Sequence, residues 1–180
     1  MVYILLGTGF EEIEALTPVD LLRRAGEEVR TVGLNGKIVY GGHAIGVEAA
    51  VTIEELDVRD AEMIVLPGGL GGVASIRGCE EALAAVKPVY DSGKYVAAIC
   101  AGPPVLADLG LLSGVRATCY PGQIPNMKDA LVAENAACVT DGKVITGTSA
   151  GTAVPFALAL IEALKGAEAA RAIADQIVIR

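Results

Sequence analysis

The chain has 180 residues, 53% of them hydrophobic and 22 of them glycine, which predicts one α/β domain over residues 1–180 with a substantial core. A net charge of -8 without a basic patch argues against nucleic acid as a partner, because phosphates would repel it. The longest uncharged run, residues 144–161, contains threonines, glycines and a proline, so it predicts strand, turn and helix and not a membrane span.

The cysteines and the N-terminus indicate the compartment. Met1 leads directly into an apolar run without any resemblance to a signal peptide, so we expect a cytoplasmic protein. The four cysteines, at positions 79, 100, 119 and 138, lie far apart, with no Cys-x-x-Cys spacing and no second histidine. We therefore expect neither a disulfide framework nor a metal site.

Short apolar runs alternate with helical patterns along the chain. The runs predict buried strands at residues 2–6, 29–34, 63–66, 96–99 and 115–119. Helices are expected at 80–92 and 149–165, and an Ala-rich helix ends near residue 176. This order predicts a three-layer sandwich with a mostly parallel sheet and a site at the carboxyl ends of its strands.

The segment after the first strand predicts a helix. Gly7-Thr8-Gly9 resembles the start of a dinucleotide fingerprint, but Glu12 stands where a small residue is needed, so we discount nucleotide binding. Glu11, Glu12 and Glu14 fall in or near the first helical turn, where negative charge is favourable. Thr17-Pro18 predicts a kink or restart before the helix ends at Gly26.

Two dipeptides predict hairpins. Asn35-Gly36 indicates an antiparallel excursion over residues 37–40 and 44–48, and Asp141-Gly142 indicates a second hairpin over 136–140 and 143–146. Thr52 is expected to cap a short turn that reaches residue 56. Both excursions would add antiparallel pairs to an otherwise parallel sheet.

A glycine-rich segment, Pro67-Gly68-Gly69-Leu70-Gly71-Gly72, follows the strand at 63–66. Its backbone can approach another group closely, so its N–H groups could form an oxyanion hole. An ordinary flexible loop fits the same composition.

Cys100 stands between a buried strand and an expected helix start. The spacing from Ala98 to Gly102 is small-x-Cys-x-Gly, as a sharp strand-to-helix turn requires, and prolines 103 and 104 suit a first helical turn. Backbone donors at such an elbow favour the reactive thiolate. The competing interpretation is a buried core thiol.

Four motifs together resemble the ThiJ/PfpI family, which includes the parkinsonism-associated deglycase. They are Glu11-Glu12-Ile13-Glu14 with Pro18-Val19-Asp20 and Arg23-Arg24-Ala25-Gly26, then Leu66-Pro67-Gly68-Gly69, then Ala98-Ile99-Cys100-Ala101-Gly102-Pro103, and finally Thr146-Gly147 before a long helix. The motifs span nearly the whole chain. The resemblance implies a flavodoxin-like fold, similar to class I glutamine amidotransferases, and a homodimer.

The resemblance also implies site residues. Cys100 would be the nucleophile, Glu14 its partner, and Gly68 and Gly69 would line the site through their N–H groups. Spacing alone does not choose among the three first-turn glutamates. Since Glu14 and Cys100 cannot both ionise freely at short range, we expect Glu14 to hold the proton beside a Cys100 thiolate.

Departures from the family limit the chemistry. Relatives described as proteases carry a histidine where Ala101 stands, which argues against a Cys-His peptidase. Tyr120 stands where the deglycase has a histidine, and it is a poor base. Cys119 could be a resolving thiol or a packed core residue, and Arg24 could reach a partner's site or be an ordinary surface residue. The only histidine, His43, is not expected to be catalytic.

We therefore expect an enzyme that acts on small reactive carbonyls, as a glyoxalase or deglycase does, without a cofactor. Cys100 would attack the carbonyl, Glu14 would move the proton, and the Gly68, Gly69 and Ala101 N–H groups would stabilise the oxyanion. The alternative is an oxidative-stress sensor or chaperone in which Cys100 is oxidised to a sulfinate. Both need one acidic thiol, so the sequence does not separate them.

Overall fold

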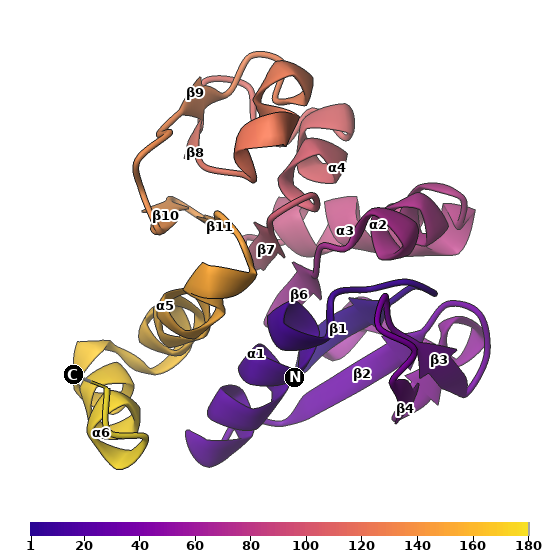
Figure 1. Ribbon diagram of the computed structural model, residues 1–180, viewed down its shortest axis with the longest axis horizontal. Coiled ribbons are helices and arrows are strands. Elements are labelled where there is room, and N and C mark those ends of the chain that lie inside the picture. The colour runs from indigo at the N-terminus through magenta and orange to yellow at the C-terminus, as the bar shows by residue number, and fades with distance from the viewer. Residues whose placement is uncertain (180) are drawn as a thin grey trace.

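The computed structural model describes residues 1–179 and contains a seven-stranded sheet of order β10-β11-β7-β6-β1-β2-β5 (Figure 1). Its strands are β1 (Val2–Leu6), β2 (Val29–Gly33), β5 (Val51–Thr52), β6 (Met63–Leu66), β7 (Tyr95–Ile99), β10 (Cys138–Asp141) and β11 (Val144–Gly147). Neighbouring strands of this sheet are parallel, apart from the antiparallel pair of β10 with β11. The predicted parallel sheet is confirmed.

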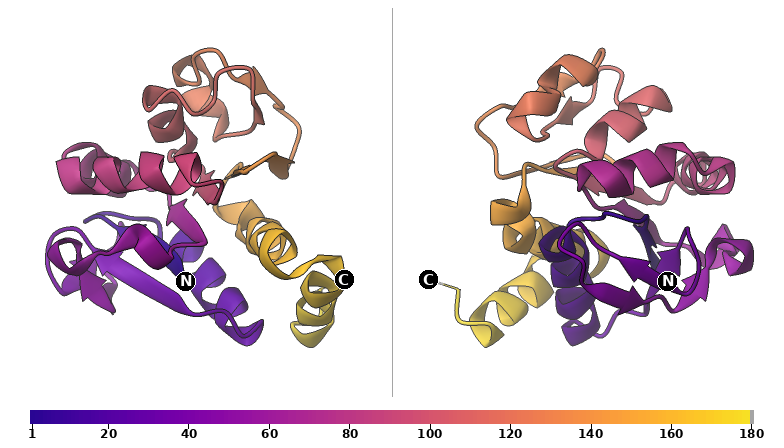
Figure 2. Two further views of the ribbon diagram at one scale, coloured as in Figure 1. Left: turned by 180° about the vertical axis from the view of Figure 1, so that it is seen from behind. Right: turned by 45° about the vertical axis from the view of Figure 1, so that its right-hand side comes forward.

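Helices cover both faces of the sheet (Figure 2). One face carries α1 (Glu12–Arg24), α5 (Ala153–Lys165) and α6 (Ala167–Gln176), and the other carries α2 (Leu70–Arg77), α3 (Glu80–Asp91) and α4 (Pro103–Asp108). Alternate residues of β1 enter the two cores, with Tyr3 and Leu5 in one and Ile4 and Leu6 in the other. The three-layer, flavodoxin-like sandwich is confirmed. None of these helices in the described part of the chain is long and apolar enough to span a bilayer.

Short elements complete the fold. Two separate two-stranded sheets pair β3 (Ile38–Tyr40) with β4 (Gly46–Glu48) and β8 (Arg116–Ala117) with β9 (Leu131–Val132), and the short helices are η1 (Ile53–Glu55), η2 (Val58–Asp60), η3 (Pro121–Asn126) and η4 (Ala150–Thr152). The antiparallel excursion exists, but Asn35-Gly36 links β2 to β3 across two sheets and does not close a hairpin. Asp141-Gly142 does close the β10–β11 hairpin.

The structure corrects the sequence prediction at two helices, whereas the predicted kink at Pro18 stays a prediction. Helix α1 runs through Pro18 without a restart, because its buried face, which includes Val19 and Leu22, packs in the core despite the missing hydrogen bond. The second half of the glycine-rich segment begins helix α2 and is not a loop. Glycine is needed there for close packing, since a Cβ at Gly72 would lie 2.6 Å from the Cα of Phe10.

The topology brings three chain segments to one edge of the sheet. Strands β7, β6 and β1 are adjacent and parallel, so their carboxyl ends lie side by side. The segments that leave these ends are the start of α1, the glycine-rich segment and Cys100. This is the edge where open α/β sheets bind ligands.

Phe156 tests the core beneath this edge. Its ring is fully buried in α5, among the residues that pack on the sheet, so Phe156→Ala leaves a cavity there. We expect the variant to lower the free energy of unfolding by about 3–5 kcal/mol, measured by urea denaturation. Leu131→Ala, at a side chain that is 61% exposed, is the control and should change it by less than about 0.5 kcal/mol. Equal losses would contradict this account of the core.

Candidate active site

Cys100 occupies a strained elbow directly after β7. Its φ of 64° lies in the left-handed region, which costs free energy for a residue with a side chain. Two backbone hydrogen bonds hold it there: its N–H donates to the Gly147 carbonyl at 3.0 Å, and the Tyr120 N–H donates to its carbonyl at 2.9 Å. The predicted elbow is present, and its neighbours fix the direction of the half-buried side chain.

Backbone amides surround the Cys100 sulfur, but not all of those expected. The backbone N–H groups of Ala101 and Gly69 lie close enough to it to lower the pKa of Cys100. The Gly68 N–H donates instead to Glu14 Oε2, at 2.9 Å, so it is not free for an oxyanion. Gly68 matters through its missing side chain as well, because a Cβ there would overlap Glu14 and lie 2.8 Å from the Cys100 Cβ.

Glu14 is a fully buried carboxyl group in the first turn of α1. Its Oε2 accepts the Gly68 N–H, whereas its Oε1 is buried without a nitrogen or oxygen partner within residues 1–179. Burial raises the pKa of Glu14 to about 7, and repulsion from Glu11 acts in the same direction. Oε1 is therefore the oxygen that is free to carry a proton.

Glu14 and Cys100 contact each other, so their protonation states depend on one another. Burial first, and then the charge of an ionised Glu14, raises the pKa of Cys100 to about 12, opposite to the direction that the elbow alone predicted. A protonated Glu14 would remove the repulsion and offer the sulfur a hydrogen-bond donor. The amides of Ala101 and Gly69 lower the pKa of Cys100 in either case.

A cavity of about 300 Å³ opens above this contact. Its lining residues are Glu11, Glu14, Gly69, Leu70, Cys100, Ala101, Tyr120, Gly122 and Gln123. The sequence analysis missed Leu70, Gly122 and Gln123 as site residues. These residues line the cavity because η3 and the start of α2 lie near the Cys100 elbow. No sequence pattern indicated that these two elements lie near the elbow.

Of Tyr120, Cys119 and Arg24, which the sequence suggested as further site residues, Tyr120 alone lines the cavity. Tyr120, half exposed, lines the cavity as expected. Cys119 is buried in the core and absent from the lining, as the packing interpretation expects. Arg24 pairs with Asp20 at 2.9 Å, at the end of α1 that is remote from Glu14. A role for Arg24 at a partner's site, like the homodimer itself, stays a prediction.

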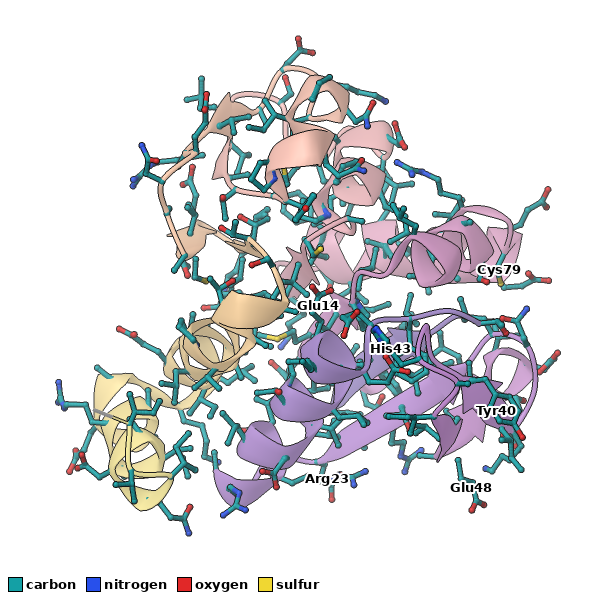
Figure 3. All side chains as sticks on the ribbon, in the orientation of Figure 1. Glu14, Arg23, Tyr40, His43, Glu48 and Cys79 are labelled. Carbon is teal, nitrogen blue, oxygen red and sulfur yellow. The ribbon has the colours of Figure 1, made fainter. Side chains whose placement is uncertain are left out.

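The exposed His43, which Figure 3 shows near Glu14, forms a contact with the buried Glu12. Glu12 is 6% exposed. Its Oε1 accepts the backbone N–H of His43 at 2.8 Å, and its Oε2 lies 2.7 Å from the ring nitrogen Nδ1 of His43. Burial acts to raise the pKa of Glu12, but the hydrogen bonds from His43 outweigh it and lower that pKa. The hydrogen bond to Glu12 and its charge raise the pKa of His43.

Glu11, Glu12 and His43 are also the group within residues 1–179 that could hold a metal ion, since three ligand atoms lie within 4.8 Å of one another. A metal would have to displace the hydrogen bond between His43 and Glu12. His43 and Glu12 satisfy each other without an ion, so the geometry gives no reason to assign one.

Comparison with known proteins agrees with this geometry. The model of the DJ-1/PfpI family matches residues 1–163. The chain belongs to the DJ-1/PfpI family. The predicted resemblance to ThiJ/PfpI proteins is therefore confirmed.

Individual DJ-1/PfpI relatives are similar along most of the chain. Protein dj-1beta of Drosophila melanogaster is 33% identical over 98% of this chain and 95% of its own, and "Deglycase PYRAB04690" of Pyrococcus abyssi is 32% identical over 86% and 90%. The solved structure titled "Toxoplasma gondii DJ-1, oxidized" has a TM-score of 0.94 and 34% identity, covering 98% of this chain and 97% of its own. The chain spans 41% of a longer relative, Protein DJ-1 homolog B of Arabidopsis thaliana, at 32% identity over 99% of this chain.

The contact between His43 and Glu12 makes the stability of the fold depend on pH. Glu12 stabilises the fold above its unfolded pKa, and this is lost as pH falls through its lowered folded pKa. His43 contributes fully below its unfolded pKa, and this is lost as pH rises through its raised folded pKa. In Glu12→Gln, NMR titration should show the His43 pKa moving back toward its ordinary value. Glu48→Gln is the exposed control, and an unchanged His43 titration in Glu12→Gln would contradict the assignment.

Proposed function

We propose that this protein is a cysteine-dependent enzyme that acts on small reactive carbonyls, as a glyoxalase or deglycase does. The observation that carries the proposal is a half-buried sulfur that faces a cavity and contacts a buried carboxyl group and two backbone N–H groups. The Pyrococcus relative, which is named a deglycase, supports the same class. Methylglyoxal is a small substrate of this kind.

The proposal requires one proton on the pair of Glu14 and Cys100. Two unit charges about 4 Å apart repel by roughly 4 kcal/mol at an effective dielectric constant of about 20, so the doubly ionised pair is unfavourable. Burial of Glu14 favours its neutral form, and its unpartnered Oε1 can hold the proton. The sulfur keeps the two N–H donors, which favour its charged form.

The reaction is internally balanced. The thiolate attacks the aldehyde carbon of methylglyoxal, and Glu14 gives its proton to the resulting oxyanion. The hydrogen on that carbon leaves as a proton and returns at the neighbouring carbon, so the aldehyde carbon is oxidised to a thioester while the ketone is reduced to an alcohol. Water then breaks the C–S bond, which releases lactate and restores the thiol. No external oxidant or reductant is consumed.

The alternative function is stress sensing through oxidation of Cys100. The same N–H donors of Gly69 and Ala101 would hold sulfinate oxygens, and a relative with 34% identity has been solved in a form titled "oxidized". Peptidase chemistry has less support, because His43 bonds to Glu12 and the cavity lining contains no histidine among the described residues.

Glu14→Leu gives a test whose sign decides the proton's place. If Glu14 carries the proton, its loss removes a donor to sulfur and raises the pKa of Cys100. If Glu14 is the ionised member, the same change removes repulsion and lowers that pKa. Ultraviolet titration of the thiolate, with Cys100→Ser to assign the signal, measures the direction. Glu48→Leu serves as the exposed control, and a lowered pKa in Glu14→Leu would overturn the proton assignment.

Lactate formation from methylglyoxal tests the activity itself. Cys100→Ser should abolish turnover, and Glu14→Leu should reduce kcat by about 10²–10⁴-fold because it removes the group that moves protons. Cys138→Ser, at a cysteine outside the cavity lining, is the matched control and should retain full activity. If the native protein forms no lactate while peroxide adds oxygen to Cys100, the sensor function replaces the proposed one.

A further inference from the structure

The cavity above Cys100 has a one-sided charge. Glu11 and Glu14 line it, and no lysine, arginine or histidine of residues 1–179 does. Glu14 is fully buried, whereas the Glu11 side chain is 21% exposed. Glu11 is therefore the acidic group that an entering molecule meets while it is still partly in water.

Glu11 is held in this position by the backbone. It is the residue that precedes α1, and its N–H donates to the Gly68 carbonyl at 3.0 Å, which ties it to the segment beside the sulfur. Its charge also reaches into the site, because it acts to raise the pKa of Glu14. The backbone that carries the Glu11 carboxylate is thus fixed relative to the reacting atoms.

His43 is the basic residue paired with Glu11, but it lies closer to Glu12. His43 Nδ1 lies 4.0 Å from a Glu11 oxygen but 2.7 Å from Glu12, which is the buried partner. A protonated His43 offsets the charge of Glu12, and a neutral His43 offsets neither glutamate. A protonated His43 supplies one positive charge to two glutamates that both lie within 4.0 Å of its ring, so the group of Glu11, Glu12 and His43 keeps a net negative charge beside the cavity in both states.

We propose that Glu11 determines the charge of the carbonyl compound that reaches Cys100. Uncharged 2-oxoaldehydes, and cationic adducts on arginine or lysine side chains, can enter next to this carboxylate. Carbonyl compounds that carry a carboxylate or phosphate group are repelled. The substrate class rests on the proposed function, but the charge selection concerns access to the sulfur and holds for any reagent that attacks it.

Alkylation of Cys100 measures access without enzymatic turnover. Iodoacetamide and iodoacetate are similar in size and differ by one negative charge, so the ratio of their rates cancels the intrinsic reactivity of the thiol. We expect the native ratio of iodoacetamide to iodoacetate to exceed that of a neutral cysteine peptide by about tenfold. Added salt should lower it, because screening weakens the repulsion. Mass spectrometry assigns the modification to Cys100.

Glu11→Gln should return the ratio of the two alkylation rates to that of the peptide. Glu48→Gln removes the same charge from an exposed residue of β4 and should leave the native ratio unchanged. Figure 3 shows Glu48 well away from Glu14. A native ratio equal to the peptide's, or no change in Glu11→Gln, would overturn the proposal.

A second readout links the selection to the substrate. Phenylglyoxal and 4-carboxyphenylglyoxal differ by a carboxylate, and Glu11→Gln should raise kcat/KM for the second relative to the first by about tenfold, mainly through KM. If neither compound is turned over but the alkylation ratio responds to Glu11→Gln, the proposed activity fails while the charge selection stands. If both are turned over with no preference in the native protein, the charge selection fails alone.

Discussion

The contact between the Glu14 carboxyl group and the Cys100 sulfur is the constraint on which the site depends. It places a fully buried and a half-buried acidic group side by side, where only one can be charged at moderate cost. Three separate segments must meet to make it: the first turn of α1, the bend after β6 and the elbow after β7. Gly68 permits the meeting, because any side chain there would overlap Glu14.

The sheet supplies the rigidity that this contact needs. The backbone strain at Cys100 costs about 1–3 kcal/mol, and it persists because the residue is held from two sides by Gly147 and Tyr120. The strand before it is buried, and residues 96–99 have no exposed surface. A side chain on such a support has little freedom to turn away from Glu14. The same support keeps the amides of Gly69 and Ala101 at the sulfur.

Much of the fold and part of the site could be predicted from local sequence. The strands near 2–6, 29–33, 63–66 and 95–99, the small residues around Cys100 and the cap at Thr52 are local signals, and the structure follows them. The strand predicted at 115–119 is wrong, because only residues 116–117 form a strand and they belong to a separate sheet. The errors arose where tertiary packing overrides local preference. Pro18 remains within α1 because the helix buries a wide face. Gly72 lies inside α2, where a side chain would overlap Phe10. The use of the Gly68 N–H by Glu14 depends on a contact 54 residues apart in sequence, which no spacing encodes.

The spacing of Glu11, Glu12 and Glu14 could not show which of them contacts Cys100, because each side chain packs against different groups. Successive helical residues point about 100° apart, so neighbours in sequence meet different surroundings. Glu12 is buried against a histidine, which stabilises its charge, whereas Glu14 is buried without a cation, which favours its neutral form. Glu11 lies at the cavity and is partly exposed to water. One short acidic run therefore yields an ion pair, a buried carboxyl group whose neutral form is favoured, and a partly exposed carboxylate at the cavity. The surroundings of each side chain set these differences.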